Sequence, residues 1–165
     1  MFGRTNMERN SMRKPLIVVV TLVACLIAAA AALASTQTIH DPNHDSKSDV
    51  DLKSATVDYD GTTISFTVVA YPGHNPTGGC IELKKGHFIG CFKQGSHYVG
   101  ENTSGKTFNV KLTHPRKHTN EFSFKASKLG NPVPGSIYWR AAFLESDQPA
   151  DAIPNKGYKK FKLTA

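Results

Sequence analysis

The sequence beyond residue 34 lacks apolar residues at helical spacing, so we do not expect a helical bundle. No segment repeats with a period of about 20 to 50 residues, and this absence disfavours a solenoid or a propeller. The chain also has no G-x-S-x-G sequence, the strained turn that presents the nucleophilic serine of many hydrolases. What remains is a series of short alternating runs separated by Gly, Pro, Asn and Asp, which is typical of β-strands.

Charged residues are missing from residues 16–34, an uncharged run of 19 residues that follows a basic segment. Ala32 and Ala34 form the small-x-small pattern that signal peptidase reads. The run is longer than the usual signal core of about 7 to 15 residues and long enough to cross a bilayer. We therefore expect residues 1–34 to be a signal peptide, with a retained membrane anchor as the alternative. A lipobox-like sequence ends at Cys25, but apolar residues continue after it. With a signal or an anchor, the rest of the chain lies outside the cell.

The chain has only three cysteines, and Cys25 belongs to the expected leader. Cys80 and Cys91 remain as an even pair in a compartment where disulfides persist. We expect them to be bonded across a hairpin. The loop of this hairpin is either residues 84–87 or only residues 85 and 86. Both registers bring the two cysteines close enough for a disulfide.

The formal net charge is +7, from 20 basic and 13 acidic residues. Without the four basic residues and one acidic residue of the leader, 16 basic and 12 acidic residues remain, a charge of +4. This excess is too small and too scattered to favour nucleic-acid binding. It suits anionic surfaces such as cell-wall polymers or lipid head groups, although we expect membrane attachment only through an uncleaved leader.

Three segments follow from composition: the leader, a flexible polar lead-in at residues 35–49, and an all-β domain at residues 50–165. The domain has about eight expected strands: two that flank Asp60-Gly61, then 81–83, 88–92, 106–112, 121–126, 137–144 and 158–163. This many short strands predict a two-sheet β-sandwich, immunoglobulin-like or jelly-roll-like. A small β-barrel is the alternative.

Asp60-Gly61 is a strong two-residue hairpin turn and fixes a testable register. It places Val57 opposite Ile64 and Ala55 opposite Phe66. The apolar residues of both strands then share one face, as a one-sided core requires.

Asp41, Asn43, Asp45 and Asp49 occupy positions one, three, five and nine of a calcium-binding loop. The match is partial, because Ser46 stands where the sharp turn needs Gly and Leu52 where a bidentate Glu belongs. The alternative interpretation is a solvated acidic lead-in. We expect no other cofactor.

Residues 100–107 fit the phosphate-binding pattern G-x-x-x-x-G-K-[ST], but an alternating run and Pro115 follow where that motif needs a helix. We interpret this segment as a connection between strands. His114 and His118 flank the same proline in a loop, where a spacing of four has no geometric meaning for a metal. Catalytic residues are not predicted.

Trp139 is predicted to fill the core, and Tyr138 and Arg140, its neighbours in the same strand, to face solvent.

Several short motifs together resemble small secreted actinobacterial β-rich proteins of unknown function: the Asp-rich lead-in, Gly79-Cys80-Ile81, Gly90-Cys91-Phe92, Leu129-Gly130-Asn131-Pro132, Tyr138-Trp139-Arg140, and residues 151–157 before the last strand. The resemblance covers most of the chain after the leader and implies export and a β-fold, without an activity.

We expect a non-enzymatic secreted or cell-surface module, for binding or structure, whose partners are cell-wall or surface glycans or another protein. The long loops at residues 71–79, 95–105 and 146–157 are the places where such scaffolds carry function. Two alternatives stay open: a small secreted hydrolase with a site built from loops, and a secreted inhibitor or toxin.

Overall fold

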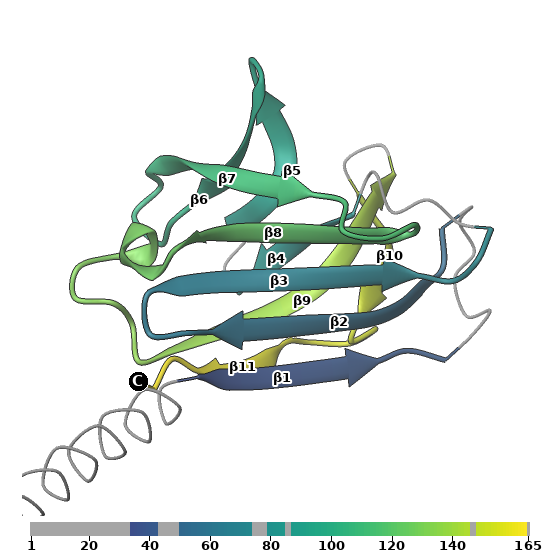
Figure 1. Cartoon of the computed structure of the whole chain (residues 1–165), viewed down its shortest axis with the longest axis horizontal. Coiled ribbons are helices and arrows are strands. Elements are labelled where there is room, and N and C mark those ends of the chain that lie inside the picture. Colours follow the sequence, from purple (N-terminus) through teal and green to yellow (C-terminus); the bar gives the residue numbers. More distant parts are fainter. Residues whose placement is uncertain (1–33, 43–49, 74–78, 85–86, 146–147, 165) are drawn as a thin grey trace, which may run out of the picture. The chain divides into compact units, whose positions relative to one another are not determined.

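The computed structural model describes residues 34–42, 50–73, 79–84, 87–145 and 148–164 (Figure 1). Residues 34–165 group into one compact unit. Residues 1–33, the expected leader, lie outside the described residues, so the signal and anchor interpretations stay predictions. No helix among the described residues has the length and apolar character needed to cross a membrane.

The described part of the chain is all-β, as predicted. Its strands are β1 (Ser35–His40), β2 (Leu52–Tyr59), β3 (Thr63–Ala70), β4 (Gly79–Leu83), β5 (His87–Gln94), β6 (His97–Glu101), β7 (Thr107–Thr113), β8 (Thr119–Lys125), β9 (Ser136–Glu145), β10 (Gln148–Ile153) and β11 (Lys159–Lys162). A 3₁₀ turn, η2 (Ala126–Leu129), is the one helical segment among these residues.

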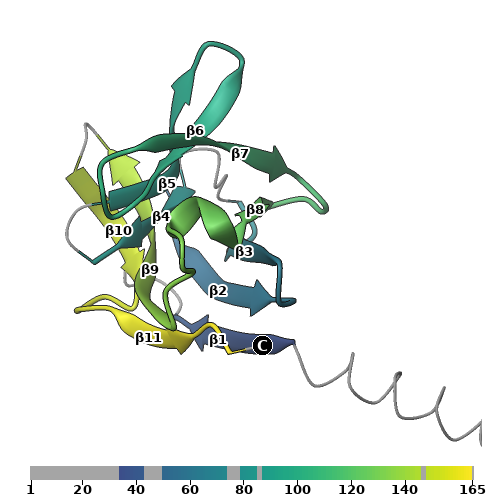
Figure 2. The ribbon, with the colours of Figure 1, turned by 90° about the vertical axis from the view of Figure 1, so that its left-hand side faces the viewer.

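All the strands belong to one antiparallel sheet in the order β1-β2-β3-β8-β7-β6-β5-β4-β9-β10, and β11 pairs with β9 beside β10. Strand β7 is the corner of this sheet. Its first half pairs with β6 and its second half, from Lys111, pairs with β8. The sheet therefore bends round on itself at β7 (Figure 2).

The two ends of the sheet meet where β1 lies beside β11 (Figures 1 and 2). Side chains bridge this seam: Ser35 Oγ donates to the carbonyl oxygen of Lys162, and Gln37 Nε2 donates to that of Lys160 at 3.2 Å. The result is a nearly closed, barrel-like sheet, close to the alternative that the sequence left open. The two-sheet sandwich with about eight strands is not confirmed.

Each of the eight predicted strands has a counterpart in the structure: β2, β3, β4, β5, β7, β8, β9 and β11. Three strands were not predicted: β1, β6 and β10. The first part of the predicted flexible lead-in is strand β1 instead. Residues 35–40 pair with β2, and every second side chain points toward the barrel. The later part of the lead-in, residues 43–49, lies outside the described residues.

The β2–β3 hairpin differs from the predicted register by two residues. Val57 pairs with Phe66 and Tyr59 with Ile64, because Asp60 opens a longer turn than the two-residue one. Its carboxylate accepts hydrogen bonds from the backbone N–H groups of Thr63 and Thr62, and these bonds lower the pKa of Asp60. A shift of two residues preserves the faces of both strands, so the predicted core residues stay buried.

Cys80 and Cys91 are bonded, with their Cα atoms 4.7 Å apart. The hairpin register still differs from both predicted versions, because Leu83 pairs with His87 and residues 84–86 lie between them. The irregularity of β5 lies in its pairing with β6, between Ile89 and Phe92, and Gly90 in this bulge has a φ of 78°. Its α-hydrogens face the ring of Phe122, which leaves no room for a β-carbon.

The barrel interior is filled by aromatic and aliphatic side chains. Trp139 is 0% exposed, as predicted, and its ring centroid lies 5.4 Å from that of Phe66. Its indole N–H donates to Gln37 Oε1 at 3.1 Å, so the core tryptophan is tied to the seam strand. This core holds β4, β9 and β11 in place, and these strands carry the candidate site.

Candidate ligand-binding site

A pocket of about 280 Å³ opens at the end of the barrel where β4 stops and β9 begins. Its lining is mainly apolar and comes from four parts of the chain: Leu83, Lys84, Thr103, Leu129, Pro134, Ser136, Ile137 and Tyr138. Apolar walls with a few polar groups at the rim are typical of small-ligand sites. The pocket is therefore the candidate site of this chain.

Tyr138 stands at the rim with 40% of its surface exposed, which confirms that it faces solvent. Two lysines flank its ring: Lys84 Nζ is 5.0 Å and Lys160 Nζ 5.8 Å from the ring centroid. The backbone sets this arrangement, because Lys160 pairs with Tyr138 across β9 and β11, and the N–H of Lys84 donates to the Tyr138 carbonyl at 2.9 Å. The rim thus presents an aromatic ring between two cations.

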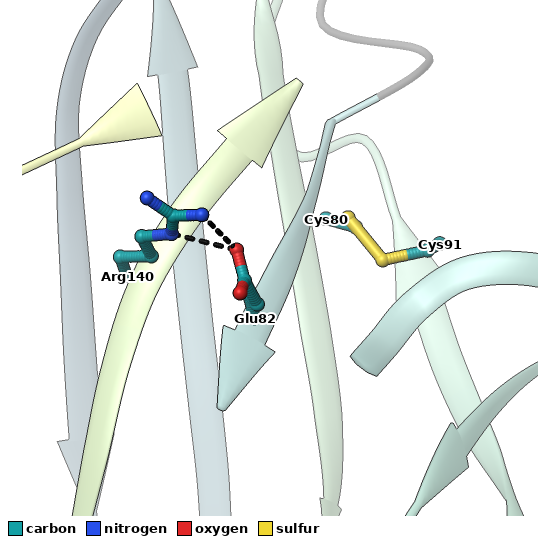
Figure 3. The surroundings of a disulfide bond; sticks show 4 residues. All are labelled: Cys80, Glu82, Cys91 and Arg140. Carbon is teal, nitrogen blue, oxygen red and sulfur yellow. Dashed lines mark hydrogen bonds and ion pairs between the residues drawn. A yellow bond between two sulfur atoms is a disulfide. The ribbon is translucent and has the colours of Figure 1, made fainter. Parts of the chain in front are cut away.

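Glu82 and Arg140 form an ion pair next to this rim (Figure 3). They are directly opposite in β4 and β9, and Arg140 Nε donates to Glu82 Oε2 at 2.6 Å. Tyr158 donates its hydroxyl to the other carboxylate oxygen, and the Arg140 guanidinium lies 5.2 Å from the Tyr158 ring. Both oxygens of Glu82 are occupied, so this cluster ties β4 to β9 and to the segment before β11.

Burial raises the pKa of Tyr158, and the hydrogen bond to Glu82 and the negative charge of Glu82 act in the same direction. The phenol therefore stays protonated at neutral pH and serves as a hydrogen-bond donor. A general base or a phenolate nucleophile needs the opposite shift.

Asn102 shapes the turn that carries Thr103 to the pocket. Its Oδ1 accepts hydrogen bonds from the backbone N–H groups of Ser104 and Lys106, each at 3.0 Å. Its Nδ2 donates to the carbonyl of Lys128 in η2, next to the pocket residue Leu129. Strand β7 follows this turn, so the segment that fits the phosphate-binding pattern connects two strands, as predicted.

The predicted calcium loop falls largely outside the described residues, which exclude Asn43, Asp45 and Asp49. Asp41 is described and buried; its backbone N–H donates to the Lys53 carbonyl at 3.1 Å. Within the described ranges, no three His, Cys, Asp or Glu side chains are placed to hold a metal ion. Calcium binding at these four residues stays a prediction.

The predicted loop histidines are in the connection between β7 and β8. His114 Nδ1 shares a 2.8 Å hydrogen bond with Asn120 Oδ1, which anchors that connection to β8. His118 has a φ of 60°, so it occupies a turn.

Of the two residues predicted to face solvent, Tyr138 is exposed, whereas Arg140 is half-buried in its ion pair with Glu82. The pocket beside them was missed. The missed residues, such as Leu83, Leu129 and Ile137, look like ordinary core positions in the sequence. They line the pocket because β4, η2 and β9 lie close together in the fold, which the sequence does not show.

Comparisons with known proteins give no match: no protein family, curated protein or solved structure matches this chain.

Proposed function

We propose that this chain is a non-enzymatic binding module that works outside the cell, secreted or at the cell surface, and takes an anionic glycan at the Tyr138 pocket. The observation that carries the proposal is the exposed Tyr138 ring between the Lys84 and Lys160 ammonium groups. A sugar ring has an apolar face that packs against an aromatic side chain. Its carboxylate or phosphate substituents then lie near two cations.

Two features support an extracellular place of work. The uncharged run behind a basic segment is suited to export, and the bond between Cys80 and Cys91 suits an oxidising compartment.

The polar cluster beside the pocket supports binding over catalysis. Glu82 is engaged by Arg140 and Tyr158, and the raised pKa of Tyr158 keeps its proton in place. A catalytic acid or base needs a group that exchanges protons near the working pH. The apolar pocket and its cationic rim can hold a ligand without such a group.

The test is binding of the purified chain to polygalacturonate, a carboxylated glycan, with neutral dextran as the comparison ligand. We expect micromolar binding to the anionic polymer that weakens as salt rises. Tyr138→Ala should weaken it about tenfold, a loss of about 1.4 kcal/mol. Lys84→Gln should weaken binding most at low salt and make the salt dependence of the affinity shallower, because it removes one of the two cations.

The matched control is Lys53→Gln, because Lys53 Nζ lies 5.9 Å from the Tyr71 ring in a similar cation–ring pair away from the pocket. It removes the same charge and should leave binding within about twofold of wild type. Equal binding by Tyr138→Ala and wild type, or no binding to any anionic glycan, would refute the proposal.

A further inference from the structure

The tip of the β5–β6 hairpin projects from the barrel (Figures 1 and 2). Burial stops abruptly along it, since residues 92–97 are all exposed while Ile89 and Gly90 are buried. Phe92 is 48% exposed, more than Tyr138 and Val133, the other exposed large hydrophobic residues among those described. Its ring packs edge-to-face on Phe88, with the ring centroids 6.0 Å apart, and still leaves about half of Phe92 open to a partner.

The tip is rigid enough to keep Phe92 outside. Its strands are paired to their ends: Phe92 with Val99, Lys93 with Tyr98, and Gln94 with His97. Gly95 has a φ of 62° in the two-residue turn, the conformation that such hairpins require. At the base, the disulfide joins β4 to β5, and Phe88 and Cys91 pack on a small second core of Cys80, Ala142 and Ala152.

The charge of the tip has one sign. Residues 91–100 contain Lys93 and no acidic residue. Lys93 Nζ lies 5.8 Å from the Tyr98 ring, so the cation and the second aromatic residue of the tip are adjacent. Aromatic side chains that sit at the head-group level, beside a lysine that pairs with anionic lipids, are the features of a membrane-interface contact.

We propose that this tip docks the domain on an anionic lipid bilayer, a membrane contact beyond the leader, which was the only one expected from the sequence. Phe92 lies at the boundary between head groups and acyl chains, and Lys93 lies among the head groups. A bilayer fits better than a protein partner because six exposed residues offer far less than the roughly 800 Å² per partner of a stable protein interface. Binding at a membrane interface grows with the buried apolar area and with attraction to anionic lipids, so one phenylalanine and one lysine give a weak, reversible contact. The tip is separate from the Tyr138 pocket. The whole of β6 lies between them, because it begins at the tip and ends just before the pocket residue Thr103.

The test is co-sedimentation of residues 34–165, the compact unit without the apolar leader, with vesicles of phosphatidylcholine alone or mixed with phosphatidylglycerol. We expect sedimentation only with the mixed vesicles. Phe92→Ala should lower the partition coefficient about tenfold, and Lys93→Gln about fivefold. Phe92→Trp adds an exposed indole to the buried Trp139, and its emission should shift to the blue on anionic vesicles.

Val133→Ala is the matched control, because Val133 is also an exposed hydrophobic side chain, at 36%, and lies outside the hairpin. It should sediment like wild type, and Trp139 emission in every variant verifies that the barrel is folded. Equal partitioning of Phe92→Ala and wild type overturns the inference, as does a wild type that stays in the supernatant. A pull-down from cell-envelope extract decides the remaining case. If wild type captures a protein that Phe92→Ala and Lys93→Gln lose, and no form of the chain binds vesicles, the tip docks on a protein and the inference is also overturned.

Discussion

Two glycines of strand β5 and its turn have positive φ angles, but only one of them has a neighbour where a β-carbon would lie. At Gly90 a β-carbon would meet Phe122 Cδ1 at 2.3 Å and Cε1 at 2.4 Å. At Gly95 nothing lies within 4 Å. Phe122 is fully buried, so its ring cannot move aside.

We therefore expect Gly90→Ala to lower the free energy of unfolding by about 2 to 4 kcal/mol, from overpacking and from the left-handed backbone. Gly95→Ala should cost only about 1 kcal/mol, because it meets the backbone penalty alone. Urea unfolding followed by Trp139 emission measures both. Equal losses would mean that the Phe122 ring does not pack on Gly90 as described.

The sequence could not reveal this role of Gly90. A glycine next to a cysteine in an expected strand indicates a bulge at most. The close contact depends on β8, which supplies Phe122 from a distant part of the chain. Trp139, in contrast, was predictable as a core residue, because apolar and polar residues alternate along its own strand and put Trp139 on the apolar face.

At the scale of elements, local patterns identified strands well and their pairing poorly. The β2–β3 register shifted by two residues because Asp60 accepts two backbone N–H groups in its turn. The β4–β5 register differs by one residue, because Leu83 pairs with His87. Strand β1 was missed because it has a polar composition, and its burial comes from β2 and β11 instead of its own apolar residues.

Gln37 makes β1 more than an edge strand, since it bonds both the Lys160 carbonyl and the Trp139 indole. Gln37→Ala should lower the free energy of unfolding by about 1 to 3 kcal/mol, because it leaves the buried indole N–H without its acceptor. Thr38→Ala is the control on the same strand, and it removes only the exposed hydrogen bond to Thr56. We expect a loss below about 0.5 kcal/mol for it.

Thermal unfolding and the emission maximum of Trp139 distinguish these outcomes. A red shift in Gln37→Ala, with no shift in Thr38→Ala, would show that the seam protects the core from water. If both variants melt like wild type, β1 does not close the barrel in solution.

At the scale of the molecule, closure joins parts of the chain that no local pattern connects. The seam bond from Ser35 to Lys162 spans 127 residues. A sandwich and a barrel share the same strand alternation, and only the meeting of β1 with β11 separates them. The pocket also joins distant parts of the chain, because the β4–β9 pairing puts Tyr138 beside Leu83, and Leu129 of η2 completes the lining.

The predicted cleavage site lies between Ala34 and Ser35, immediately before the first residue of β1. A cut there keeps the whole strand, including both of its seam side chains, Ser35 and Gln37. We therefore expect the protein recovered from the medium to have the mass of residues 35–165 less two hydrogens, since Cys80 and Cys91 are bonded. Intact mass spectrometry before and after reduction measures the cut and the bond together. A product of full length with free thiols in the cytosol would contradict export, and with it the oxidising compartment on which the proposed function depends.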